Sequence, residues 1–594
     1  MSTGNGTLLA RASPPTLDNA DKPIKQTPDK QAVLQTVSVM KNKRTTYEKR
    51  WKSIRDYQLP FLGVFSDTAD ETDRGRRRDT EIANGVAWLS NQAFAAGVMS
   101  GLTPPSRQWF KFGFSDGTEG DVEAEQVLDE RQAILEAFLH RSNFYNSIHT
   151  IYMELPFGQA PLGVFSSPQT GIRFQPYTIG TYYLGANGSG QINTFARRIQ
   201  MTAAQIVEQF GTDNLPQTIR DALQNKSAKF SKEFNIWWLV RPNDNRISGQ
   251  IGSKNMPFQS LYWVEGQEET GNGGFLHVGG FHEFPVLTAR YQVTDIDAYG
   301  KGPGWYAEGD AKALQKMKKD FLIACDMLVK PPMKGPSTLM NTGINMIPGG
   351  MTYVNETTAS NTVTPLFQIQ SNPTFLAEEI IRTEQNIKRI YSADLFLMLD
   401  QVDTPQMTAR EVVERQQEKL QQLGPVVERL QDEFLSPIIE RAYNILERMG
   451  AFPPISDDLL MRMQDKEIKI EYISPLAQAQ KMSGLVNIEQ ALSFVGQMIQ
   501  LYPEVRNMVD PLGTTRRYFE LLGAPAAMQR PEEEVQAIMK QEQQAMQEQQ
   551  QMQAQQQMAQ TAAPAAQAAK NLTEAANDGN PALTQLLGMG TPEG

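Results

Sequence analysis

The chain has 594 residues, of which 40% are hydrophobic and 21% charged, and its formal net charge is −11. A chain of this length exceeds what one hydrophobic core needs, which predicts several lobes. The single cysteine, Cys325, excludes an intramolecular disulfide and a thiolate metal cluster and fits a reducing compartment. The acidic balance argues against tight nucleic-acid binding, which requires a basic face.

The N-terminal third is predicted to open with an arm and continue with helices. Residues 1–28 lack periodicity and predict a disordered arm, and residues 29–59 follow with a basic amphipathic helix that Pro60 ends. No leader-like segment and no apolar run of about 18 residues occurs, so we expect neither secretion nor a membrane span. Further predicted elements are a helix rich in small residues, a strand-like aromatic run and a third helix, at residues 79–102, 109–114 and 122–140.

The stretch 158–300 has the densest content of glycine, aromatic and β-branched residues. Runs such as FNIWWLV (residues 234–240) and SLYWVEG (residues 260–266) are typical of strands. One helix is expected within it, at residues 202–210. The sequence therefore predicts a β-rich lobe with a single helical interruption.

Two helices separated by an excursion come next. Residues 305–329 predict a helix that ends before two prolines, and residues 373–391 predict a helix that returns. The 40 or so residues between them are rich in Gly, Pro, Asn and Thr and indicate a small β excursion. Three lysines at i, i+4 and i+7 share one face of the first helix: Lys312, Lys316 and Lys319.

The longest helical pattern runs from residue 408 to residue 449, after a short apolar and acidic segment at 392–406. Gly424, Pro425 and Pro437 lie inside it. A proline removes one intrahelical hydrogen bond and clashes with the preceding turn, so the helix is expected to bend at these positions.

The C-terminal part is predicted to contain shorter helices to about residue 522 and then a tail of low complexity. Residues 541–560 include 12 glutamines. Glutamine favours helices, but low complexity equally favours disorder, so the tail is either a solitary or bundled helix or a disordered segment.

Signatures of common enzymes are missing from the sequence. It contains no GxxxxGK[ST], HExxH, GxSxG or paired CxxC motif. The four histidines have no metal-ligand spacing, and GKGPG at residues 300–304 is better explained as a turn than as a phosphate loop. We therefore expect no enzymatic activity, no cofactor and no metal.

Two charged clusters have both a functional and a structural interpretation. The arginines Arg74, Arg76, Arg77 and Arg78 could contact phosphate, but a solvated loop or a salt bridge between subunits is favoured, because charge runs usually face water or pair. The lysine face has the same ambiguity: alone it indicates a solvated face, and it indicates DNA contact if the helix lines a channel.

The segment 392–406 carries three carboxylates, Asp394, Asp400 and Asp403, which could bind Mg²⁺ or transfer protons. It is also apolar, with Leu395 and Phe396 among its members. A packed or mobile loop between helices is the favoured interpretation, since the sequence offers no partner base, nucleophile or phosphate loop.

Three stretches of the sequence together resemble the head-to-tail connecting, or portal, proteins of podoviruses. They are DTEIANGVAWLSNQAFAAGVMSGLTPPSRQWFKF (residues 79–112), the region from GQAPLGVF to FARRIQMTAAQIVEQFG (residues 158–211), and MTAREVVERQQEKLQQLGPVVERLQDEFLSPIIERAYNILERMG (residues 407–450). The third stretch is the most specific. The resemblance covers roughly residues 30–525.

The resemblance implies a multi-lobed α+β subunit, mainly α, with wing, stem, clip and crown regions, which assembles into a ring, normally of twelve copies. Residues 392–406 would form the tunnel loop. The implied regions are a disordered arm (1–28), a wing (29–304), a stem helix (305–331), a clip (332–371), a stem helix (372–391), a tunnel loop (392–406), a long kinked wing helix (407–450), a crown (451–530) and a Gln-rich tail (531–594).

The function implied is that of a ring at one capsid vertex through which double-stranded DNA is packaged and ejected without sequence-specific contacts. The implied partners are further copies of the chain, the terminase large subunit, the major capsid and scaffolding proteins, and tail adaptor proteins. Assembly in the host cytoplasm and a final place in the virion follow, with no membrane partner. The rival functions are a structural tail or scaffold protein, suggested by the Gln-rich tail, and a metal-dependent nuclease or ATPase.

Overall fold

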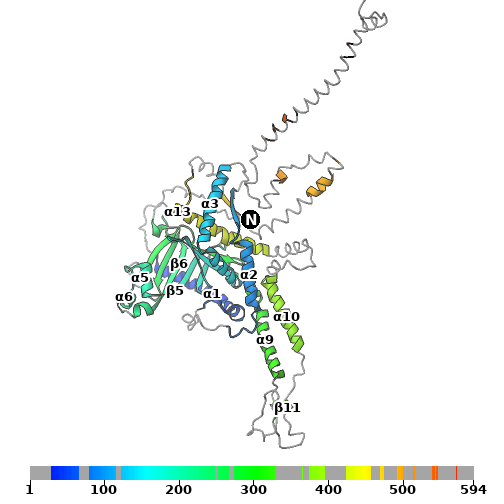
Figure 1. Ribbon diagram of the computed structural model, residues 1–594. Coiled ribbons are helices and arrows are strands. Elements are labelled where there is room, and N and C mark those ends of the chain that lie inside the picture. Colours follow the sequence, from blue (N-terminus) through cyan, green and yellow to red (C-terminus); the bar gives the residue numbers. More distant parts are fainter. Residues whose placement is uncertain are drawn as a thin grey trace, which may run out of the picture. The chain divides into compact units, whose positions relative to one another are not determined.

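The computed structural model describes residues 28–65, 79–114, 122–225, 227–247, 252–266, 273–329, 333–334, 364–365, 373–394, 423–455, 468–473, 491–498, 502 and 513–515, with isolated positions beyond them. Contacts divide the chain into two units, Met1–Gly117 with Glu123–Val509, and Thr118–Val122 with Asp510–Gly594. The site discussed below lies in the first unit. Its fold is α+β with more helix than strand (Figure 1).

Two antiparallel sheets form the β-rich part that the sequence predicts. The larger has the strand order β4-β5-β6-β7-β8 and the smaller the order β3-β2-β9. The strands are β2 (Gln159–Ser167), β3 (Gly171–Pro176), β4 (Tyr182–Ala186), β5 (Ile192–Thr202), β6 (Glu233–Pro242), β7 (Phe258–Val264), β8 (His277–Phe281) and β9 (Val286–Arg290).

Aromatic pairs hold the centre of the larger sheet together. Trp237 on β6 lies opposite Trp263 on β7, and Trp238 lies opposite Tyr262. The ring centroids of these pairs are 6.1 and 5.8 Å apart and nearly parallel, an arrangement that stabilises neighbouring strands. The N-terminal half of the long helix α1 (Lys30–Tyr57) covers the face that carries Trp237 and Trp263, since its buried side chains join their core cluster.

Three short helices interrupt the sheet between β5 and β6, where the sequence predicts one. They are α5 (Ala203–Phe210), α6 (Gln217–Gln224) and α7 (Ala228–Ser231). Thr202 and Gln205 form a capping box that fixes the start of α5. The second and third helices have eight and four residues, too few for a clear 3.6-residue pattern.

The largest core cluster lies among α2 (Val86–Leu102), α3 (Val122–Arg141), α4 (Phe144–Glu154) and α13 (Ser436–Arg448). The 3-10 turn η1 (Leu155–Phe157) connects α4 to β2. The prediction of a helix over residues 79–102 is wrong at its start, because residues 79–85 are not helical. The reason is that the amides of Ala83 and Asn84 donate to the side chain of Gln315 instead of to a helical carbonyl.

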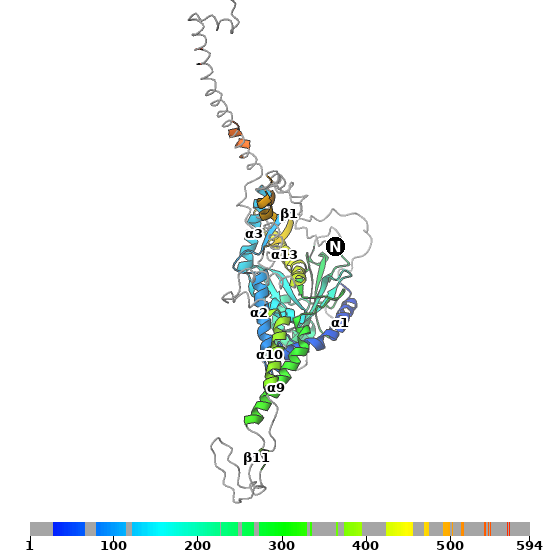
Figure 2. The same cartoon turned by 90° about the vertical axis from the view of Figure 1, so that its right-hand side faces the viewer.

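Two antiparallel helices project from this body side by side, as both Figure 1 and Figure 2 show. They are α9 (Glu308–Val329), preceded by the single turn α8 (Pro303–Tyr306), and α10 (Pro373–Ile390). Between them β10 (Met333–Lys334) pairs with β11 (Thr364–Pro365). We call α9 and α10 the stem, and residues 28–306 with 423–473 the wing.

At Pro437, where the sequence predicts a bend, the helix changes type. Residues 423–430 are α-helical, residues Gln431–Leu435 form a π-helical turn, and α13 continues from Ser436. Pro437 has no backbone N–H, and the wider turn before it relieves the clash with the preceding carbonyl groups. Gly424 and Pro425 lie in the first described turn of this helix, so the predicted bend there falls at the edge of the described residues.

One strand pairing joins distant parts of the chain. β1 (Phe110–Phe114), the predicted strand-like run, pairs with β12 (Ile468–Tyr472). Ile468 is buried in the largest core cluster. A segment of the predicted crown range thus forms a sheet with a segment of the predicted wing range, whereas the sequence indicates only helices there.

Candidate functional site

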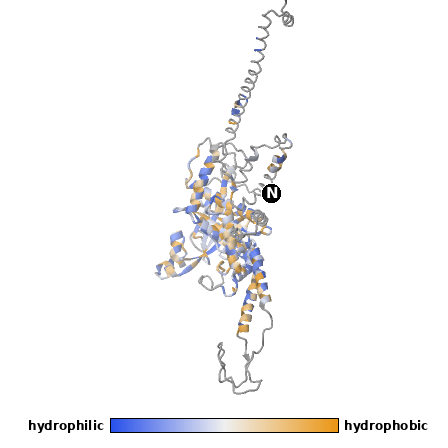
Figure 3. Cartoon of the chain, turned by 45° about the vertical axis from the view of Figure 1, so that its right-hand side comes forward, coloured by the Kyte–Doolittle hydropathy of each residue, from blue (hydrophilic) through white to orange (hydrophobic). Residues whose placement is uncertain are grey.

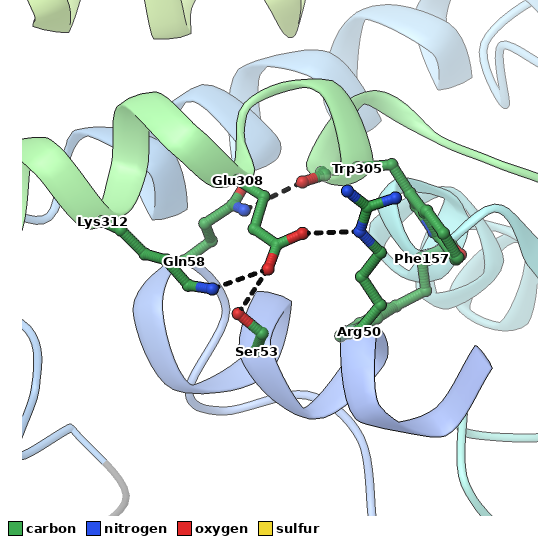
Figure 4. Close-up of polar contacts among 8 residues, drawn as sticks. Arg50, Ser53, Gln58, Phe157, Trp305, Glu308 and Lys312 are labelled. Carbon is green, nitrogen blue, oxygen red and sulfur yellow. Dashed lines mark hydrogen bonds and ion pairs between the residues drawn. The ribbon is translucent and has the colours of Figure 1, made fainter. Parts of the chain in front are cut away.

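The candidate site is the junction of wing and stem, which includes the predicted lysine Lys312. At the start of α9, the carboxylate of Glu308 accepts hydrogen bonds from Arg50 Nε at 2.8 Å, Ser53 Oγ at 2.7 Å and Lys312 Nζ at 2.7 Å (Figure 4). Burial alone would raise the pKa of Glu308, but these three donors hold that pKa below its usual value. Glu308 therefore stays charged and fastens α9 to α1.

A second contact at the junction runs through Gln58, just beyond the end of α1. Its amide nitrogen donates to the carbonyl of Gly304 at 2.9 Å, and its oxygen accepts from the hydroxyl of Tyr391 at 2.8 Å. Both Gln58 and Tyr391 are buried. Gln58 thus connects the end of α1 to α8, the single turn before α9, and to Tyr391, the residue that follows α10.

A third contact uses every hydrogen-bonding position of one buried amide, that of Gln315 on α9. Its oxygen accepts from the amides of Ala83 and Asn84 at 2.7 and 2.8 Å, and its nitrogen donates to the carbonyls of Asn84 and Tyr57 at 2.8 and 3.2 Å. Asn84 also donates to Glu384 on α10 at 2.6 Å. A buried amide that is fully satisfied fixes the segments around it.

The three predicted lysines have different surroundings. Lys312 pairs with Glu308, as described, and Lys319 Nζ lies 2.9 Å from Glu81 Oε2. Lys316 is exposed, and within the described part of the chain its ammonium has no ion pair. Of the three, Lys316 has the charge most available to an outside partner.

Buried arginines fix the end of the long helix to the wing. Arg441 on α13 donates to the carbonyls of Val164 and Glu283, each at 2.9 Å, and pairs with the Glu283 carboxylate. Arg290 of β9 reaches Glu433 in the π-helical turn at 2.8 Å. The wide turn is therefore held at Glu433, and the helix that follows it is held at Arg441.

The remaining predicted site residues divide into two groups. Asp394 is half-buried in a helical turn that follows α10. The others lie outside the described residues: Leu395, Phe396, Asp400, Asp403, Arg74, Arg76, Arg77 and Arg78.

The described residues contain neither a cluster of metal-binding side chains nor a helix able to span a membrane. They contain no group of three or more His, Cys, Asp or Glu side chains placed to hold a metal ion. None of the helices that the structure describes is long and apolar enough to cross a bilayer.

Sequence reasoning missed Gln58, Gln315 and Tyr391. A signal for Gln315 did exist. It occupies a position of α9 next to the buried Ala311 and Leu314, and a polar side chain at a core position requires hydrogen-bonding partners. The identity of those partners depends on segments more than 200 residues away.

Known proteins match this chain over most of its sequence. A family model described as bacteriophage head to tail connecting protein matches residues 30–529. The portal protein of Salmonella phage epsilon15 is 34% identical over 95% of this chain and 99% of its own length. A probable portal protein of Bordetella phage BPP-1 is 30% identical over 84% of this chain and 89% of its own length.

Likeness to solved structures is more distant. A chain of the virion of a native gene transfer agent particle is 11% identical, with a TM-score of 0.33, over 70% of this chain and 86% of that chain. A chain of the neck of an empty particle of this kind is 10% identical, with a TM-score of 0.34, over 71% of this chain and 90% of that chain.

Proposed function

The chain belongs to the bacteriophage head to tail connecting protein family and is a portal subunit, and we propose that twelve copies form a ring that double-stranded DNA crosses at one capsid vertex. The observation that carries this proposal is the match to the family and to a portal protein over nearly the whole chain. We further propose that the ring has no catalytic activity, that it assembles in the host cytoplasm, and that it ends in the virion.

The proposed partners follow from the family. During packaging the ring would dock the terminase large subunit through the segment between α9 and α10. The major capsid and scaffolding proteins would surround it, and tail adaptor proteins would bind it after packaging.

The proposed contact with DNA is weak and without sequence preference. Lys316 is the main candidate among the three lysines, because Lys312 and Lys319 have carboxylate partners within the chain. Exposed lysines attract phosphate over about a Debye length, roughly 8–10 Å at physiological salt. The net charge of −11 per copy limits adhesion of the duplex elsewhere.

Electron microscopy of the purified full-length protein tests the proposal. We expect closed rings with an axial hole about as wide as a DNA duplex. Monomers or fibres would contradict the proposal and would favour the rival function of a tail or scaffold protein. Magnesium-dependent hydrolysis of DNA or ATP that is lost in Asp400→Asn would contradict the absence of catalysis.

A further inference from the structure

One carboxyl group lies inside the wing without a cationic partner. Glu154, the last residue of α4, is 1% exposed. Thr178 Oγ1 lies 3.0 Å from its Oε1, and the amide nitrogen of Ile179 lies 3.1 Å from its Oε2. Within the described part of the chain, no lysine or arginine pairs with it. An ionised carboxylate is costly in such a site, because two neutral hydrogen bonds replace only part of its hydration.

The charged and titratable groups around Glu154 do not neutralise it. Tyr182 of β4 interacts with Glu154, and its hydroxyl donates to the carbonyl of Gln159 at 3.2 Å. The guanidinium of Arg44 from α1 donates to the carbonyl of Tyr182 at 3.0 Å and pairs with Glu48 at 3.4 Å. Arg44 is therefore engaged by β4 and by its own helix. The titratable groups beside Tyr182 are Arg44 and Tyr299.

Both donors to Glu154 belong to the segment that connects the two sheets of the wing. Residues 177–181 lead from β3 of the smaller sheet to β4 of the larger one. The residues after α1 hold this segment from the other side, because the amide of Val64 donates to the carbonyl of Ile179 at 2.9 Å. Gly180 has a φ of +94°, and a Cβ there would lie 2.0 Å from the carbonyl oxygen of Val64. Thr178 is only partly buried, so water reaches the outer side of the segment.

We propose that Glu154 is a proton-controlled latch, which holds residues 177–181 against the end of α4 when it is neutral and releases them when it is ionised. In the neutral acid, Oε1 carries the proton and donates it to Thr178 Oγ1, while Oε2 accepts from the amide of Ile179. Loss of that proton to water leaves a negative charge that no cation meets. The charge regains its hydration when the segment moves outward and its contact with Val64 breaks. The two sheets are then joined less firmly.

The latch changes state near neutral pH. Burial raises the pKa of Glu154 from 4.5 to about 7, and the hydrogen bonds from Ile179 and Thr178 lower it only in part. In the opened segment the carboxyl is hydrated and has its ordinary pKa. The equilibrium constant for opening therefore rises with pH, by about 30-fold between pH 5 and pH 8. The latch belongs to the single subunit, so it does not depend on the proposed ring.

Hydrogen exchange of the full-length protein tests the latch, when it is followed by mass spectrometry from pH 5 to pH 8 and corrected for the intrinsic effect of pH. Wild-type protection of residues 177–181 should fall by about 30-fold over this range. At pH 8 it should lie well below the protection of β6, which reports unfolding of the whole wing. Glu154→Gln should lose the pH dependence, since its amide stays neutral and keeps an oxygen for the amide of Ile179.

Glu136→Gln is the matched control and should retain the wild-type pH dependence. Glu136 is another partly buried carboxyl with a raised pKa, but it lies on α3 and accepts from Gln132. Thr178→Val removes the donor to Oε1 and keeps the carboxyl, so the midpoint of the fall should move to higher pH. Three results would each overturn the proposal: the same pH dependence in the wild type and Glu154→Gln, equal protection of residues 177–181 and β6 at pH 8, or an unchanged midpoint in Thr178→Val.

Discussion

Large apolar side chains are buried in the wing and exposed in the distal stem. In the wing, Trp51, Trp109 and Trp263 are fully buried within one chain. In the distal stem, Val329 and Phe375 are about three-quarters exposed. The wing therefore has an apolar core of its own, whereas the distal stem has large apolar side chains that the described residues of the same chain leave exposed (Figure 3). The difference teaches that the stability of the subunit depends far more on the buried residues of the wing than on the exposed apolar residues of the distal stem.

The largest expected effect is on the wing core. Trp51→Ala removes a fully buried indole that stacks on Tyr47 and meets the edge of Tyr299. We expect the free energy of unfolding of the monomer to fall by about 3–5 kcal/mol, as for other large-to-small changes in a core. Denaturant unfolding below the concentration of ring formation measures it.

The matched change in the stem, Phe375→Ala, should alter the unfolding of the monomer by less than about 0.5 kcal/mol, the range typical of surface substitutions. A similar loss of monomer stability in both variants would contradict the difference between wing and stem.

The next effect concerns the junction. Gln315→Ala would leave the amides of Ala83 and Asn84 and the carbonyls of Asn84 and Tyr57 without their side-chain partner. We expect the free energy of unfolding to fall by about 2–4 kcal/mol. Each unsatisfied buried polar group costs about 1–3 kcal/mol, and water can reach some of these groups. Hydrogen exchange should increase at residues 83–84. Unchanged protection there would show that Gln315 does not fasten wing to stem.

A pH effect should be confined to the wing. Burial raises the pKa of Glu154 to about 7, although the amide of Ile179 and the hydroxyl of Thr178 donate to its carboxylate. The folded state thus binds this proton more tightly than the unfolded state does. Its stabilising effect is complete below about pH 4.5 and is lost as the pH rises through 7.

The free energy of unfolding of the monomer should therefore drop by about 2 kcal/mol from this group between pH 5 and pH 8. Glu154→Gln should flatten that dependence, whereas Phe375→Ala should retain it. An identical pH profile for Glu154→Gln and the wild type would show that another group is responsible.

The smallest effect concerns the exposed lysine of the stem. Lys316→Ala should weaken the retention of a short DNA duplex by purified rings on the order of two- to fivefold, with a smaller dependence on salt. Lys43→Ala, which changes an exposed lysine on α1, is the control and should have no effect. Loss of rings in Lys316→Ala would indicate that Lys316 contacts the neighbouring copy instead.

Much of the fold could be predicted because its signals are local. The two stem helices, the aromatic strands and the capped helix α5 all follow from periodicity or from residues a few positions apart. The pairing of β1 with β12 could not be predicted, since about 350 residues separate the strands. The non-helical residues 79–85 were missed for the same reason, because their partner Gln315 is distant in the sequence.

The candidate site was predictable in part. Periodicity puts Lys312, Lys316 and Lys319 on one face, and the structure separates them by their partners Glu308 and Glu81, which periodicity alone cannot reveal. The proline signal at Pro437 correctly indicated an irregular helix. It did not indicate the type of irregularity, since a proline is compatible with a break, a bend or a wider turn.

The π-helical turn at Gln431–Leu435 also changes how the two parts of its helix are rotated relative to each other. A π turn is equivalent to one residue inserted into an α-helix, so residues 423–430 are rotated by about 100° relative to the phase that α13 alone would give them. Arg290 holds the turn itself through Glu433, and Arg441 holds α13 after it. Removing a single residue between 431 and 435 would therefore turn the N-terminal part of the helix about its own axis while leaving α13 in place.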